Sequence, residues 1–75
     1  MKVILRTGDW ARRYVPEREA EIALDAPATA RRAALKAGIP ESEIGFAERG
    51  GVLIDLDLAL EDGDRLTIHP SIIGG

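Results

Sequence analysis

The sequence predicts a two-layer α+β domain in which a single helix covers a mixed sheet of four to five strands. Three observations support this prediction: apolar residues alternate along segments near both ends of the chain, one central stretch has helical spacing, and 75 residues suffice for only one core. The sequence contains no cysteine, which excludes a disulfide framework, a thiolate metal site and a thiol nucleophile. We therefore expect one domain over residues 1–70 and a flexible tail over residues 71–75.

Two strands are expected in the first third of the chain. Val3 and Leu5 lie two residues apart in the first segment, and a second alternating segment covers residues 19–24. A period of two residues is typical of a strand with one buried face. Turn signals occur over residues 7–18 between the two segments, so this connection either extends the hairpin or forms a helical turn.

One helix is expected to begin at Ala30. Thr29 offers a side-chain oxygen to the N–H groups of the first turn, and Gly38 stops the helix. Alanines recur at helical spacing along one face, but alanine adds little apolar area. We therefore expect Leu35 and Ile39 to supply most of the contact between this helix and the core.

Three more strands are expected after the helix. Ile44 and Phe46 share one face by alternation, a turn follows at residues 50–51, and residues 52–54 resume the alternation. The acid-rich residues 55–64 lack a regular period and are expected to form turns. The last strand has one apolar and one polar face, which are Leu66, Ile68 and Pro70 on one side and Arg65, Thr67 and His69 on the other.

The order of elements is therefore strand, strand, helix, strand, strand, strand. It describes a hairpin joined by a helix to further strands of the same sheet, with a right-handed crossover expected. This order corresponds to the β-grasp arrangement.

The charge balance limits the classes of partner. The formal net charge is −3, with eight arginines and two lysines against thirteen acidic residues, so the clustered positive charge that nucleic acid requires is not expected. No apolar run is long enough for a membrane span or for a secretory signal. We expect a cytoplasmic protein that is monomeric when free and binds a basic protein surface, with neither nucleic acid nor a membrane as its partner.

Several motifs lie in the same order as in a known family. Thr29 opens a short helix, Gly-Ile-Pro closes it at residues 38–40, two glycines form a turn at residues 50–51, and LEDGDRLTIHPSIIGG covers residues 60–75. In this order they resemble the ThiS/MoaD sulfur-carrier family, whose members are ubiquitin-like β-grasp proteins. The helix carries alanines where the family usually has leucines, and the connection over residues 7–18 is longer than in the thiamine carriers. These departures leave the choice of partner open.

The resemblance implies a carrier that is not an enzyme and holds no cofactor. An adenylating enzyme of the ubiquitin-activating kind would use ATP to adenylate the carboxylate of Gly75, and sulfur would displace AMP to leave a thiocarboxylate. The acceptor would be the large subunit of molybdopterin synthase or a thiazole synthase. The presence of a proline at position 70 and the overall length resemble the small subunit of molybdopterin synthase slightly more than the thiamine carriers.

The last five residues would then do the work of reaching the partner. Gly74 and Gly75 have no Cβ, which suits a narrow channel. Fully extended, residues 71–75 would span up to about 17 Å. The side chains expected to contact the partner are those of Pro70, Ser71, Ile72 and Ile73.

Two other functions stay open. A ubiquitin-like modifier would be attached through Gly75 to lysines of other proteins. A non-covalent β-grasp interaction module would not need its terminal glycines at all. The first alternative shares the tail with a sulfur carrier, so the sequence does not separate the two.

Three further groups of residues are interpreted as structural. His69 is the only histidine, and we expect an exposed side chain at a strand end instead of a catalytic group. Residues 55–64 lack the ligand spacing of a calcium loop, so we expect solvated turns there. An aromatic and basic cluster before the second strand is interpreted as edge packing instead of a single-strand nucleic-acid site. Its members are Trp10, Arg12, Arg13 and Tyr14.

Overall fold

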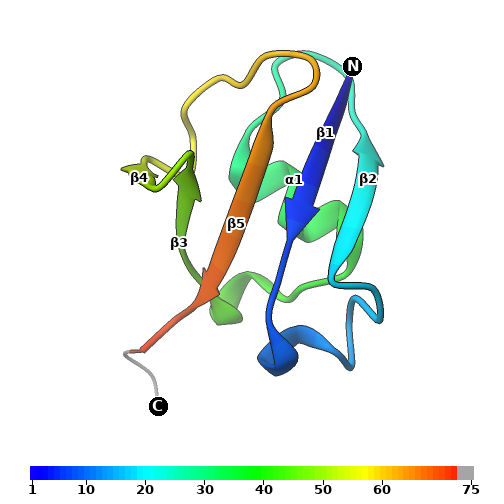
Figure 1. Ribbon diagram of the computed structural model, residues 1–75, viewed down its shortest axis with the longest axis vertical. Coiled ribbons are helices and arrows are strands. Elements are labelled where there is room, and N and C mark those ends of the chain that lie inside the picture. The colour runs from blue at the N-terminus through cyan, green and yellow to red at the C-terminus, as the bar shows by residue number, and fades with distance from the viewer. Residues whose placement is uncertain (73–75) are drawn as a thin grey trace.

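A computed structural model describes residues 1–72 and shows one five-stranded sheet with one α-helix against one of its faces (Figure 1). Among these residues, no helix has the length and apolar character needed to cross a membrane. The elements are β1 (Lys2–Arg6), β2 (Glu19–Ala23), α1 (Ala30–Ala37), β3 (Ile44–Arg49), β4 (Val52–Ile54) and β5 (Arg65–Pro70), with short 3-10 turns at Asp9–Ala11 and Glu41–Glu43.

The last strand occupies the centre of the sheet. The strand order is β2-β1-β5-β3-β4. β5 pairs in parallel with β1, where Leu5 lies opposite Leu66, and antiparallel with β3, where Ala47 lies opposite Ile68. This mixed sheet with its single helix confirms the predicted α+β fold class. β5 ends at Pro70, the last residue of the predicted domain, whereas the flexibility expected of residues 71–75 stays a prediction.

The helix begins and ends where the sequence predicts. The Thr29 side-chain oxygen accepts a hydrogen bond of 3.1 Å from the backbone N–H of Arg32, which satisfies one of the open donors of the first turn. Gly38 closes the helix with φ at 109°, in the left-handed region that favours glycine.

The prediction for Leu35 is wrong. Its side chain is 42% exposed, whereas Ile39 is 1% exposed, as predicted. Successive helical residues are about 100° apart around the axis, and the face turned toward the sheet is the one that carries Ala33 and Ala34, so Leu35 points to the side. Large side chains therefore reach the helix from the sheet. They come from Val3, Leu5, Leu66 and Ile68, each at most 1% exposed.

The prediction that Ile44 and Phe46 share one face of the strand is also wrong. The pairing of β3 with β5 shifts register between these two residues, which is a β-bulge around Gly45. A bulge adds one residue to one strand and so reverses which side chains point inward. Ile44 and Ala47 are buried as a result, and Phe46 lies on the other face of the sheet, 38% exposed.

The connection between β1 and β2 forms a 3-10 turn, one of the two predicted outcomes. Asp9–Ala11 makes this turn, and Ala11 and Val15 are buried in the core. Trp10 and Tyr14 pack against the same core, so the interpretation of these two aromatic residues as packing residues is confirmed.

Replacing Thr29 with alanine should lower the free energy of unfolding by about 1 kcal/mol, because the N–H of the first helical turn loses its acceptor. Thr29→Ser keeps the hydroxyl and is the matched control. Urea denaturation followed by circular dichroism measures both variants. Equal stability of the alanine and serine variants would contradict the role of the cap.

Candidate functional site

The candidate site is the root of the tail, defined here as residues 70–72. β5 ends at Pro70, and the backbone N–H of Ser71 donates a hydrogen bond of 3.0 Å to the carbonyl oxygen of Glu43, just before β3. The next side chain, Ile72, is 87% exposed. The chain therefore stays attached for one residue beyond the end of β5, to the turn that precedes β3, and then presents an isoleucine to solvent.

Of the predicted site residues, Pro70, Ser71 and Ile72 belong to this root. The predictions for Ile73, Gly74 and Gly75 concern residues outside the described part of the chain, and they stay predictions.

Gly45 permits the close contact between β3 and the root. Ile44 lies opposite Pro70 in the pairing of β3 with β5. A Cβ on Gly45 would lie 2.3 Å from the carbonyl oxygen of Pro70 and 2.8 Å from the nitrogen of Ser71. These atoms are backbone and cannot rotate away, so the two strands can approach this closely only with glycine at this position.

Tyr14 binds the side chain of Glu43, the residue whose carbonyl group accepts the hydrogen bond from Ser71. The Tyr14 hydroxyl donates a hydrogen bond to the Glu43 carboxylate. This hydrogen bond, with smaller effects from desolvation and from the negative charge of Glu43, raises the pKa of Tyr14 above its ordinary value of 10.0. Glu43 thus has its side chain fixed by Tyr14 while its carbonyl group binds Ser71. The long connection between β1 and β2 thereby contacts the residue that anchors the tail.

His69 is less exposed than predicted. Its ring stacks on Phe46, with 4.6 Å between ring centroids and 13° between ring planes, and its Nε2 contacts the carboxylate of Glu48. The bulge at β3 causes this arrangement, because it turns Phe46 to the face on which His69 lies. The His69 side chain is 32% exposed and therefore lies in a contact with β3, not at an exposed strand end.

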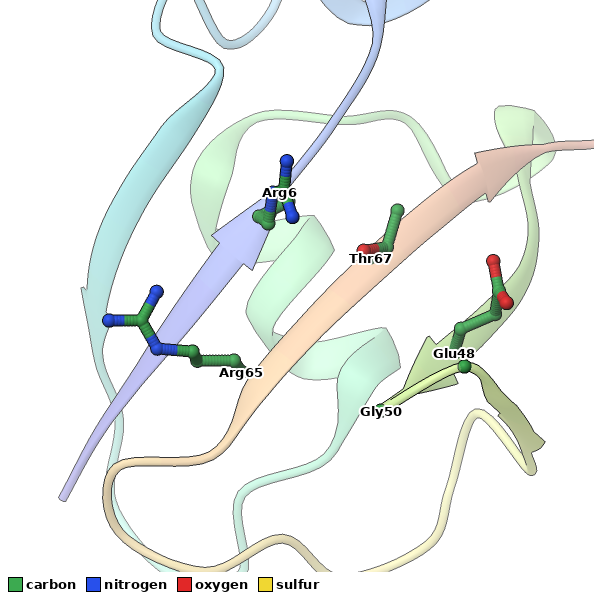
Figure 2. A pocket seen from close by; sticks show the side chains of 6 residues that line it. Arg6, Glu48, Gly50, Arg65 and Thr67 are labelled. Carbon is green, nitrogen blue, oxygen red and sulfur yellow. The ribbon is translucent and has the colours of Figure 1, made fainter.

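The sheet face away from α1 carries a shallow hollow of about 360 Å³ (Figure 2). Arg6 and Arg65 lie on one side of this hollow, Glu48 on the other, and Thr67 between them. Both arginines are already paired with Glu19, at 3.4 and 3.8 Å. Since the positive and negative groups compensate one another, the hollow does not select strongly for a charged ligand.

The acid-rich stretch after β4 makes structural ion pairs. Asp57 accepts a hydrogen bond of 2.8 Å from Arg31 on α1, which holds the pKa of Asp57 below its usual range. Asp64 pairs with Arg49 at 3.0 Å. Within residues 1–72, no three histidine, cysteine, aspartate or glutamate side chains gather as metal ligands.

Sequence reasoning missed the residues that anchor the root. Gly45 had a weak signal, because a glycine inside an alternating strand often marks a bulge or a close approach of two backbones. Glu43 and Tyr14 had none, since their contact joins residues 29 positions apart.

The Tyr14 hydroxyl should ionise above its ordinary pKa in the wild type and at a lower pKa in Glu43→Ala, because the variant lacks the hydrogen bond and the negative charge of Glu43. Tyr14 is the only tyrosine, so absorbance of the phenolate against pH reports on this group alone. A folded-state pKa above the unfolded value means that the contribution to stability is present below pH 10.0 and is lost as the pH rises through the raised pKa. Identical titration curves for the two proteins would contradict the contact.

No protein-family model matches the chain, and no curated protein matches it in sequence. Solved structures do match. SAMP1 from Haloferax volcanii superimposes with a TM-score of 0.71 at 20% identity, covering 100% of both chains. A protein described as molybdopterin converting factor subunit 1 from Pyrococcus furiosus has a TM-score of 0.70 at 19% identity, covering 96% of this chain and 99% of that one. A second structure of the H. volcanii small archaeal modifier protein 1 has a TM-score of 0.69 at 16% identity, covering 95% of this chain and 98% of that one.

These neighbours are β-grasp proteins of the ThiS/MoaD type, which the resemblance in the sequence predicts. At this level of identity the match establishes the fold, and the chain has the ubiquitin-like β-grasp fold.

Proposed function

We propose that the chain is a sulfur carrier whose reacting group is the carboxylate of Gly75. The observation that carries this proposal is the way the chain leaves the sheet. Ser71 is held to β3 by Glu43, and the following side chain, Ile72, is 87% exposed. An arm with a fixed root and an exposed apolar residue suits insertion into another protein, where the isoleucine would become buried.

The chemistry needs no side chain of the carrier. An oxygen of the Gly75 carboxylate attacks the α-phosphorus of ATP in a partner enzyme, and pyrophosphate leaves. The product is a mixed anhydride, in which AMP is a good leaving group. Sulfide (HS⁻) supplied at the partner then attacks the carbonyl carbon. A C–S bond forms, the C–O bond to AMP breaks, AMP and the sulfide proton leave, and a thiocarboxylate remains.

The proposed partners follow from this chemistry. An adenylating enzyme of the ubiquitin-activating kind binds and uses the ATP, so the carrier itself holds no cofactor. The sulfur acceptor is the large subunit of molybdopterin synthase or a thiazole synthase. The P. furiosus neighbour, described as molybdopterin converting factor subunit 1, favours the first of these. In that pathway the chain acts as a small non-catalytic subunit, and its place of action is the cytoplasm.

A second candidate is a ubiquitin-like modifier. It is favoured by the likeness to the small archaeal modifier protein 1 of H. volcanii over the whole chain. In this case a lysine amine of a target protein attacks the activated carbonyl carbon of Gly75. An isopeptide C–N bond forms, the C–O bond to AMP breaks, AMP leaves and the amine loses a proton. Both candidates share the activation step and differ in the nucleophile that follows it.

Incubation with the activating enzyme of the same organism, ATP and a sulfur donor should exchange one oxygen atom of the chain for one sulfur atom. Intact-protein mass spectrometry detects this exchange, and fragmentation of the intact ion locates it at residue 75. A variant that lacks residues 74 and 75 is the control and should stay unchanged in mass.

Two results separate the candidates. Isopeptide-linked adducts in cell extracts, without a thiocarboxylate form, would favour the modifier over the carrier. An unchanged mass with the active enzyme, together with normal function of the shortened variant, would contradict both and leave the non-covalent interaction module.

A further inference from the structure

We infer that Gly45 positions the tail for activation: because it has no side chain, β3 can hold the root of the tail at one place and in one direction. This inference rests on the proposed function, since it concerns the step at Gly75. It assigns a role in that step to a residue that lies in a different strand from the tail.

The first support is the contact between Gly45 and the root. A Cβ at this position would lie 2.3 Å from the carbonyl oxygen, 2.5 Å from the carbonyl carbon of Pro70 and 2.8 Å from the nitrogen of Ser71. Real Cβ atoms essentially never come within 3.0 Å of such atoms. Any side chain here would therefore push the end of β5 away from β3.

The second support is that the register shift and the anchor coincide. The β-bulge lies between Ile44 and Phe46, directly after Glu43, whose carbonyl oxygen binds the N–H of Ser71 at 3.0 Å. Glu43 is itself held through its carboxylate by Tyr14. Glu43 thus binds the root directly, and Tyr14, which is far from Glu43 in the sequence, supports it by holding the Glu43 side chain.

This anchor shortens the arm that can reach into a partner. Of the tail residues 71–75, residues 72–75 lie beyond the bond between Ser71 and Glu43. Four residues span at most about 14 Å when fully extended, compared with about 17 Å for the five residues after Pro70. A shorter arm has fewer backbone torsions that can compensate for a displacement of its root.

Displacement of the root should therefore lower the rate of adenylation. A misplacement of about 1 Å from a change far from the reacting atoms can cost about 100-fold in rate. The side chains expected to contact the partner keep their chemical identity, and only the position of the root changes, so the effect should fall on kcat more than on KM.

The test compares Gly45→Ala with Gly63→Ala in full-length protein. Gly63 is the matched control, because its φ of 87° strains an alanine while no atom lies within 4 Å of the added Cβ. It precedes β5 at the end of the strand that lies away from the root. Both variants therefore lose stability, but only the first moves the root.

Two measurements are made on each variant. ATP–pyrophosphate exchange with the activating enzyme gives kcat and KM, and hydrogen exchange followed by NMR gives the protection of the Ser71 amide. For Gly45→Ala we expect kcat to fall by about 10- to 100-fold with KM nearly constant, and faster exchange at Ser71. Gly63→Ala should match the wild type in kcat and should keep Ser71 protected relative to the rest of β5.

Equal kcat values for the two variants would overturn the inference, and so would unchanged protection of Ser71 in Gly45→Ala. Hydrogen exchange at Ser71 needs no partner enzyme. A wild type that is never adenylated would therefore refute the proposed function, while hydrogen exchange would still test whether Gly45 holds the root. Should Gly45→Ala not fold, Tyr14→Phe releases the side chain of Glu43 and adds no atom near Pro70. It should weaken Ser71 protection and lower kcat by a smaller factor, and no change in either would overturn the inference.

Discussion

The structure depends on the pairing of β5 along both of its sides. β1 binds one side in parallel and β3 binds the other antiparallel, so the last strand of the sequence is the central strand of the sheet. Leu66 and Ile68 on this strand are each 1% exposed and contribute to the core beneath α1. A segment that follows such a strand starts from a strand that is hydrogen-bonded on both sides. Ser71 extends this hold by one residue through its bond to Glu43.

Signals within a few residues of one another predicted the elements well. The cap at Thr29, the left-handed Gly38 and the alternation in β1 and β5 each depend on local geometry, and each occurs where expected. The errors at Phe46 and His69 have another origin. They follow from a bulge that forms where β3 pairs with β5, and within β3 itself only Gly45 gives a weak sign of it.

The same distinction between local and long-range signals applies to the candidate site. The resemblance of residues 60–75 to a known family predicts a functional role for the tail, but it does not predict which residues hold the tail in place. Tyr14 and Glu43 come into contact only in the folded chain, and no period or spacing in the sequence connects them. The need for glycine at position 45 comes from β5, because a Cβ there would overlap the carbonyl group of Pro70. In both cases the position of the root depends on residues outside the tail, which the folded sheet brings next to it.

A structure of the chain bound to its activating enzyme and ATP tests the central claim most directly. The account predicts that the carboxylate of Gly75 lies at the α-phosphate of ATP, while Pro70 and Ser71 keep their contacts with Gly45 and Glu43. A complex in which the end of the chain lies outside the nucleotide site, or in which the root has separated from β3, would contradict it.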